Sequence, residues 1–480
     1  MIRNPDLPLH GHFSAAGSRW SIRSNSAALL QCAAATFPRL TPRGRARLHA
    51  DIYVDNSSRH EPLWHVPQFR GREHLVFADY GPGDRILADL GSRHVIGCLS
   101  AATAADISFG KRVIFPILLG IVGAVVGVTA LHCACLRYKG EGLLFAGESG
   151  AGKSTLSFEL SRRGLDFISD DWTYFSPAGG EVLAWGLPTN IKLLPDSISH
   201  FSELARYVPQ THLNGELALD VAPEEVGIRR ARCCRPGRIF VLERQPGSTF
   251  EPTRLAAGEI SAYFRHSLEK LPACLADSRE TQLATIRALC QAECWHIRCG
   301  GTPREIATRI LQFCDHTSPR SATPAAPFPV TRREWPDLLR RFSPLPIQES
   351  FASDGFTVQV ASNSERAISA LRRITQPRTH SLPPVISWSI QEEPEWPADM
   401  LSSGALACGA LSFLNLGGHS FAAFDRQTMR AVTFIAGRNA GRELESSLRL
   451  VFSHLLRESA ALPHAVPHYT SSSDSSLPAC

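Results

Sequence analysis

The stretch Gly147-Glu148-Ser149-Gly150-Ala151-Gly152-Lys153-Ser154 decides how this chain is interpreted. It fits the pattern G-x-x-x-x-G-K-[ST] at every required position. The glycines let backbone N–H groups approach phosphate oxygens, and the N-terminus of a following helix adds partial positive charge. The pattern therefore predicts a phosphate-binding loop. The candidate nucleotide-binding residues are Gly147, Glu148, Ser149, Gly150, Ala151, Gly152, Lys153, Ser154 and Thr155.

The segments beside the loop favour the same interpretation. Residues 143–146 are an apolar run typical of a buried strand, and residues 154–163 have a helical pattern that Gly164 can terminate. In this context we expect ATP and Mg²⁺ as cofactors. Lys153 would neutralise the β- and γ-phosphates, and the Ser154 hydroxyl would ligate magnesium. The alternative is a glycine-rich turn that arose by chance.

Two adjacent carboxylates follow the loop helix. Asp170 and Asp171 come directly after the predicted strand Leu165–Ser169. Either carboxylate could hold magnesium or take a proton from an attacking hydroxyl. Aspartate is also common at solvated loop starts and helix caps, so the pair alone leaves both interpretations open.

The order of elements around the loop resembles the catalytic domain of HPr kinase/phosphorylase, a bacterial protein-serine kinase whose fold is akin to phosphoenolpyruvate carboxykinase. In that family a histidine starts a strand upstream; a β-turn, a second strand, the phosphate loop, a helix, a strand and an Asp-Asp pair follow. Here His132 precedes Gly147 by fifteen positions, residues 138–142 supply the turn, and Asp170 follows Gly147 by twenty-three. The resemblance covers about Leu131–Leu194.

The resemblance implies an α/β fold with a P-loop core and a role for each candidate residue. Asp170 is the implied general base, and His132 lies beside it to tune or share the proton. Asp171 is implied to assist metal or phosphate binding, so the implied metal ligands are Ser154 and Asp171. The catalytic set is then Asp170, His132, Asp171 and Lys153. The alternative for His132 is a histidine of the core.

The sequence departs from the family pattern in two places. His132 is followed by Cys133 instead of glycine, and no second glycine-containing signature with its arginine-rich segment is found downstream. Lys192 could face the phosphates or the solvent, and we favour the solvent. We therefore expect phosphorylation of a serine or similar hydroxyl on a protein or peptide, without phosphorylase activity. The acceptor could be a ribosomal peptide precursor or an HPr-like protein.

The longest uncharged run, Val113–Leu136, is long enough to span a membrane. A buried helix over Ile114–Val122, a turn, and a buried strand over Thr129–Leu136 explain it equally well. The resemblance places a central sheet strand here, which favours the core. A membrane-anchored sensor is the remaining alternative for this run.

Composition sets the wider limits. The chain has 480 residues, of which 44% are hydrophobic and 20% charged, with 50 basic and 45 acidic residues. These values argue against a disordered chain and against a nucleic-acid-binding protein. Thirteen cysteines in so long a chain do not suggest a disulfide framework, and the N-terminus shows no signal-peptide pattern, so we expect a cytoplasmic protein. A zinc site at Cys290, Cys294, His296 and Cys299 is not favoured because the spacing lacks C-x-x-C pairs.

Two distant segments resemble each other. Phe13…Trp20–Ser26 and Phe351…Phe356–Ser364 both combine a strand with a Ser-Asn-Ser turn before a helix. We also equate residues 74–79 with 419–425, 86–90 with 431–435, and the apolar helices 107–123 with 444–456. These similarities predict a duplicated α/β module, and chance similarity of two small modules is the alternative.

The predicted organisation follows from these observations. An N-terminal α/β module spans residues 10–130, a P-loop catalytic domain 131–317, a Pro-rich linker 318–346, a degenerate second module 347–460, and a polar tail 461–480. The predicted function is an ATP-dependent kinase that transfers the γ-phosphoryl group to a serine or other hydroxyl. A catalytically inactive nucleotide-binding regulator is the alternative, and a homo-oligomer is compatible with either.

Overall fold

The computed structural model has a mixed α/β architecture that divides into two compact units, Arg3–Ser343 and Pro344–Cys480 with the first two residues. It describes residues 2–3, 5–57, 61–62, 64, 67–81, 83–212, 216–316, 341–353, 356–377, 386–393, 404–417, 420–436 and 441–460. Most of the predicted linker and the whole predicted tail, 461–480, lie outside the described residues. A two-residue strand, β1 (Ile2–Arg3), begins the chain.

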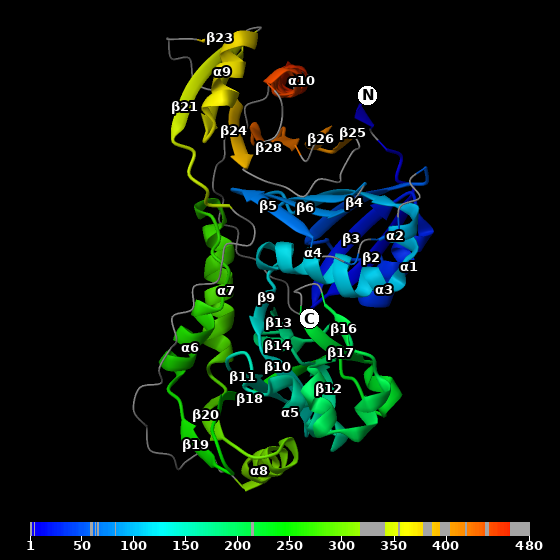
Figure 1. Cartoon of the computed structure of the whole chain (residues 1–480), viewed down its shortest axis with the longest axis vertical. Helices are drawn as coiled ribbons and strands as arrows, with labels where there is room; N and C mark the ends of the chain where they lie inside the picture. The colour runs from blue at the N-terminus through cyan, green and yellow to red at the C-terminus, as the bar shows by residue number, and fades with distance from the viewer. Residues whose placement is uncertain are drawn as a thin grey trace. The chain divides into compact units, whose positions relative to one another are not determined.

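In the described part of the N-terminal region, a mixed sheet has the strand order β2-β3-β4-β8-β7-β6-β5. Helices α1 and α4 pack on one face, where Trp20, Phe37 and Phe115 form a buried aromatic group (Figure 1). The elements are β2 (Leu9–Ala15), β3 (Ser18–Ser24), α1 (Ala27–Thr36), β4 (Leu48–Asp55), β5 (Gln68–Arg72), β6 (Leu75–Gly81), β7 (Asp84–Asp89), β8 (His94–Ser100), α2 (Ala101–Ala105), α3 (Ile107–Phe109), η1 (Gly110–Ile114), α4 (Phe115–Val122) and η2 (Gly123–Val126).

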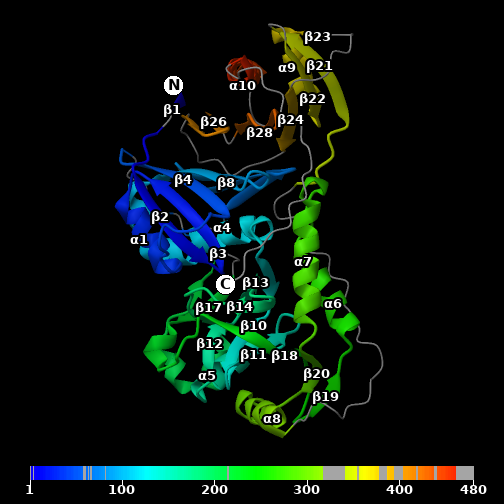
Figure 2. The ribbon, with the colours of Figure 1, turned by 180° about the vertical axis from the view of Figure 1, so that it is seen from behind.

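The second unit contains a sheet in which the described strands run β25-β26-β27-β28-β24-β22-β21-β23. Helices α9 and α10 pack together over this sheet, with Leu371 and Leu448 in a common core with Trp388 (Figure 2). The elements are β21 (Ile347–Ser353), β22 (Phe356–Ser362), α9 (Glu365–Ile374), β23 (Gln376–Pro377), β24 (Ile386–Glu393), β25 (Gly404–Cys408), β26 (Leu411–Gly417), β27 (Ser420–Asp425), β28 (Arg430–Ala436) and α10 (Gly441–Ala460).

The two sheets share their strand order and the sense of each pairing. Strands β2-β3-β4-β8-β7-β6-β5 correspond in this order to β21-β22-β24-β28-β27-β26-β25. In these two orders only the second and third pairings are parallel, namely β3–β4 and β4–β8 in the first sheet and β22–β24 and β24–β28 in the second. This correspondence corrects part of the sequence alignment. By position in the sheets, β6 matches β26, β7 matches β27 and β8 matches β28. Equating residues 74–79 with 419–425, and residues 86–90 with 431–435, was therefore wrong by one strand in each case.

The region that carries the phosphate loop has its own mixed sheet, in the order β12-β10-β11-β18-β14-β13-β9, with β20 and β19 beyond β18. Strands β11, β18 and β20 are parallel, so their carboxyl ends meet at one edge. The elements are β9 (Thr129–His132), β10 (Ala134–Tyr138), β11 (Glu141–Ala146), α5 (Lys153–Arg162), β12 (Asp166–Ser169), β13 (Trp172–Ala178), β14 (Glu181–Trp185), β18 (Cys233–Arg244), β19 (Phe250–Arg254), α6 (Ala257–His266), η6 (Ala273–Leu275), α7 (Ala276–Leu289), β20 (Glu293–Cys299) and α8 (Pro303–His316).

A small sheet of three strands in the described residues, β15-β17-β16, lies between β14 and β18 in sequence. Helical turns surround it, and η4 contributes Phe201 to a contact with Phe158 of α5. The elements are β15 (Ile191–Leu193), η3 (Pro195–Ser199), η4 (Ser202–Arg206), β16 (Gln210–Thr211), β17 (Leu217–Val221) and η5 (Pro223–Val226).

The apolar run forms the predicted helix and turn, and then two strands where one was expected. Helix α4 is followed by Gly127 in the left-handed conformation (φ 79°), and Cys133 separates β9 from β10. The continuous helical stretch Ile107–Val126 has the length and hydropathy of a membrane span, but 67% of its apolar 18-residue stretch is buried inside the protein. A core helix satisfies the same criteria, so length and composition alone do not identify a span.

Candidate functional site

The phosphate-loop sequence joins β11 to α5, as its pattern predicts. Gly147, Gly150 and Gly152 have φ values of 144°, 84° and 87°, conformations that residues with a side chain rarely adopt. Gly147 is also needed for space, because a Cβ atom there would lie 2.6 Å from the carbonyl oxygen of Leu242 in β18. The loop thus turns tightly at the edge where the parallel strands β11 and β18 end.

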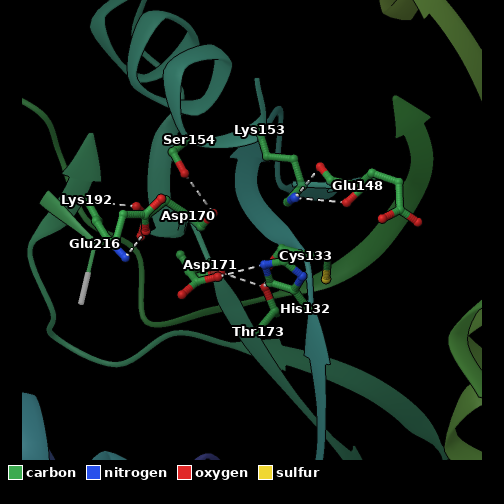
Figure 3. A network of polar contacts seen from close by, with 12 residues as sticks. His132, Cys133, Glu148, Lys153, Ser154, Asp170, Asp171, Thr173, Lys192 and Glu216 are labelled. Atoms are coloured by element: carbon green, nitrogen blue, oxygen red, sulfur yellow. Dashed lines mark hydrogen bonds and ion pairs between the residues drawn. The ribbon is translucent and has the colours of Figure 1, made fainter. Parts of the chain in front are cut away.

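Lys153 begins helix α5 and turns back over the loop. Its Nζ donates hydrogen bonds to the carbonyl oxygens of Gly147 and Glu148, at 2.9 and 3.1 Å. Burial lowers the pKa of Lys153, and the nearby Asp171 carboxylate opposes this change. The ammonium group is therefore held at the loop, where the Asp171 carboxylate acts on it (Figure 3).

Asp170 is 4% exposed and lies at the end of β12. Its Oδ2 accepts a 2.8 Å hydrogen bond from the backbone N–H of Lys192, and its carbonyl oxygen lies 3.5 Å from Ser154 Oγ. Burial and then the neighbouring Asp171 carboxylate raise the pKa of Asp170 to about 7, against the opposing hydrogen bond from Lys192. A carboxyl group with this pKa accepts a proton more readily than an ordinary aspartate does.

His132 forms an ion pair with Asp171, the residue next to Asp170, and lines the same cavity as both. Residues His132 and Trp172 face each other across the antiparallel pair β9–β13, and Asp171 directly precedes Trp172. His132 Nε2 lies 2.8 Å from Asp171 Oδ1. Burial raises the pKa of Asp171, but the hydrogen bond and charge of His132 outweigh it, so the pKa is lowered overall. The two adjacent carboxyl groups therefore have pKa values shifted in opposite directions, a pattern found at acid–base sites.

Lys192 lies in the site, so its assignment to the solvent surface was wrong. It occupies the middle of β15 and is in an ion pair with Glu216. Figure 3 shows this pair on the same side of the network as Asp170. No sequence pattern indicated Glu216, because the contact depends on the pairing of β15 with β17.

A cavity of about 430 Å³ brings these groups together. Asp170, Asp171, His132 and the loop from Ser149 onward line it. On another side its lining is Leu242, Arg244, Cys299, Pro303 and Ile306, from the carboxyl ends of β18 and β20 and the start of α8. Sequence reasoning missed Arg244, whose position follows from the parallel pairing of β18 with β11. The cavity therefore combines loop amides, cations and carboxylates in one concave site.

Of the Cys/His pattern at residues 290–299, Cys299 is the member that lines this cavity. The nearby arginines at 229, 230, 235 and 238 each have an acidic partner. His296 pairs with Glu243 at 2.9 Å, and Cys290, Cys294 and Cys299 are buried. Within the described residues these four groups do not form a metal-ligating cluster.

Comparisons with known proteins give little beyond this geometry. No family model matches the chain, and no curated protein matches it. Among solved structures, the HPr(Ser) kinase/phosphatase from Coxiella burnetii is similar over 39% of this chain and 88% of its own, at 13% sequence identity and a TM-score of 0.22.

Proposed function

We propose that the chain is an ATP-dependent kinase that transfers the γ-phosphoryl group to a serine or similar hydroxyl of a protein or peptide. The observation that supports this most is the meeting of the phosphate loop with buried Asp170 in one cavity. A loop alone would support nucleotide binding, whereas a buried carboxylate with a pKa of about 7 beside it supplies the base that phosphoryl transfer to a hydroxyl needs.

A magnesium ion fits the donor set. Ser154 offers a hydroxyl, and Asp171 offers carboxylate oxygens about the same cavity, which are the hard oxygen ligands that Mg²⁺ prefers. Few protein ligands are needed, because phosphate oxygens and water complete the shell. When bound, the ion would neutralise charge on the phosphates.

The residues of the chain then have distinct tasks. The loop amides and Lys153 bind the phosphate oxygens and orient the γ-phosphorus. Asp170 accepts the proton of the acceptor hydroxyl as its oxygen bonds to the γ-phosphorus and the bond to the β–γ bridging oxygen breaks. ADP leaves with that bridging oxygen, and Asp170 returns its proton to the solvent. His132 holds Asp171 as a carboxylate through their 2.8 Å contact.

Nucleotide binding is tested by calorimetry of the purified protein with ATP and Mg²⁺. We expect Lys153→Ala to weaken ATP binding on the order of 100-fold, since a charge-assisted hydrogen bond contributes about 1.5–3 kcal/mol. Lys139→Ala is the matched control, because Lys139 pairs with Asp315 and neither residue lines the cavity. Equal ATP affinity in the wild type and Lys153→Ala would reject the nucleotide site.

The base is tested with labelled ATP and serine-containing peptides. We expect Asp170→Asn to lower kcat by a factor on the order of 10³ with a nearly unchanged affinity for ATP. Asp84→Asn, a buried carboxylate on β7 outside the cavity lining, shows whether any loss of a buried carboxylate has this effect. Transfer that survives Asp170→Asn would refute the base, and ATP binding without any transfer would favour a nucleotide-binding regulator.

We also infer that the second unit contains a copy of the N-terminal module. In each, the asparagine of Ser-Asn-Ser hydrogen-bonds to both backbone groups of one residue on the next parallel strand, Asn25 to Val54 and Asn363 to Glu392. The same residue spacing separates the members of both pairs. The described part of the second unit has no equivalent of the phosphate loop. We therefore assign this copy to acceptor binding and not to a second nucleotide site.

A further inference from the structure

One ion pair joins the N-terminal module to the small sheet beside the candidate site. Arg112 lies in the π-helical turn η1, and its Nη1 is 2.9 Å from Asp220 Oδ2 in β17. The guanidinium carbon also lies 5.1 Å from the centre of the Trp64 ring. Both partners of the ion pair are largely buried, at 28% and 13% exposure. Ring and carboxylate together hold the guanidinium in one place.

Asp220 is directly linked to the strand that contacts Asp170. In the antiparallel pair β15–β17, Lys192 lies opposite Asp220, so their side chains share a face of the sheet. The backbone N–H of Lys192 donates a hydrogen bond to Asp170 Oδ2 at 2.8 Å. The position of β15 therefore sets the position of this donor, and β17 sets the position of β15.

The four charged groups form a row with alternating sign. Arg112 contacts Asp220, Asp220 neighbours Lys192, and Lys192 pairs with Glu216. Burial lowers the pKa of the nearby His212, and the charges of Lys192, Asp220, Arg112 and Glu216 also act on its imidazole. Without Arg112, the Asp220 carboxylate would lose its ion-pair partner and would attract Lys192 away from Glu216.

We propose that Arg112 is a positioning residue for the phosphoryl-transfer site, acting through Asp220 and β15 to keep the Lys192 N–H on Asp170. The π-helical turn supports this role, because such turns are rare in proteins and those that occur are often found at functional sites. Strands β15 and β16 have only three and two residues, so the small sheet gains much of its order from outside. The kinetic part of the proposal rests on the proposed function, and the structural part does not.

The structural part is tested by hydrogen–deuterium exchange of the full-length protein without nucleotide. We expect the Lys192 amide to exchange on the order of tenfold faster in Arg112→Ala and in Asp220→Asn, because local opening of β15 becomes easier. The double variant should exchange no faster than either single variant. Lys111→Ala is the control, since it removes a neighbouring charge and leaves the Asp220 contact intact. Unchanged exchange in a folded Arg112→Ala, or equal acceleration in Lys111→Ala, would overturn the proposal.

The kinetic part is tested by phosphotransfer. We expect Arg112→Ala to lower kcat on the order of tenfold with an unchanged KM for ATP, because a displaced base loses orientation while the phosphate loop is intact. Arg112→Lys keeps the charge and should restore part of the rate. If Arg112→Ala does not fold, hydrogen exchange and phosphotransfer are both measured on Arg112→Lys and Asp220→Asn instead. A loss of kcat/KM of the same size that came from a higher KM would overturn the positioning role. A wild type that shows no phosphotransfer would refute the proposed function, and hydrogen exchange would then be the test of the structural part.

Discussion

Gly147 combines two separate demands at one residue. Its φ of 144° excludes most side chains, and a Cβ atom would lie 2.6 Å from a backbone oxygen that cannot move freely. Gly152 has a φ of 87° and open space around its missing side chain. The loop pattern in the sequence identifies both glycines but cannot distinguish their roles, because the contact with Leu242 arises only when β18 pairs with β11.

This difference predicts unequal costs. We expect Gly147→Ala to lower the free energy of unfolding by about 3 kcal/mol or more, through backbone strain and a steric clash. Gly152→Ala should cost about 1–2 kcal/mol, from the left-handed conformation alone. Denaturant unfolding of both variants measures the difference. Equal losses would mean that β18 can move away from the loop.

A second residue-scale prediction concerns the two asparagines of the Ser-Asn-Ser turns. Asn25 and Asn363 each make two hydrogen bonds, of 2.9 and 2.7 Å, to the backbone of a neighbouring strand. Replacing either by alanine removes both hydrogen bonds, and water can take their place, so we expect each variant to lose about 1–2 kcal/mol. Chemical denaturation of the two variants would show similar losses if the modules are copies, and a negligible loss in one would argue that its turn is held differently.

At the scale of elements, the sequence predicts the strand, loop and helix well because glycine conformation and helix periodicity are local properties. It fails where long-range pairing decides. Cys133 interrupts the expected strand because β9 pairs with β13 while β10 pairs with β11 and β12. The β9–β13 pairing also brings His132 to Asp171, a contact that the sequence did not indicate. Lys192 and Glu216 enter the site through the β15–β17 pairing, which has no signature in the sequence.

Helix α10 carries a titratable group that makes the second unit sensitive to acid. His454 is 1% exposed, and its Nε2 lies 2.7 Å from Ser412 Oγ of β26. Burial lowers the pKa of His454 below 6.5, with Arg457 and Arg426 adding to this and Glu458 opposing it. The unfolded chain therefore binds a proton that the folded chain resists, and stability falls as the pH drops below 6.5.

We expect this loss to approach about 1.4 kcal/mol per pH unit, the limit for one proton. His454→Gln keeps a hydrogen-bonding side chain without the titration and should remove this part of the slope. Urea unfolding between pH 5 and 8, followed by a probe in the second unit, measures the effect. An identical slope in the variant would show that other groups cause the acid sensitivity.

At the scale of the whole molecule, the two compact units have separate hydrophobic cores. Separate cores favour separate unfolding transitions. The candidate nucleotide site belongs entirely to Arg3–Ser343, since every residue that lines the cavity lies in that unit. A ligand stabilises only the transition of the unit that binds it. The length of the chain is thus divided between a unit that nucleotide should stabilise and one that it should leave unchanged.

Differential scanning calorimetry tests this division. We expect two transitions, of which ATP with Mg²⁺ at 100 times its Kd stabilises one by about 2.7 kcal/mol. Lys153→Ala should abolish that shift, while His454→Gln should alter only the pH dependence of the other transition. A single transition that moves as a whole on adding nucleotide would show that the units unfold together. In that case nucleotide binding would stabilise the second unit as well, because a ligand raises the stability of every part that unfolds together with its binding site.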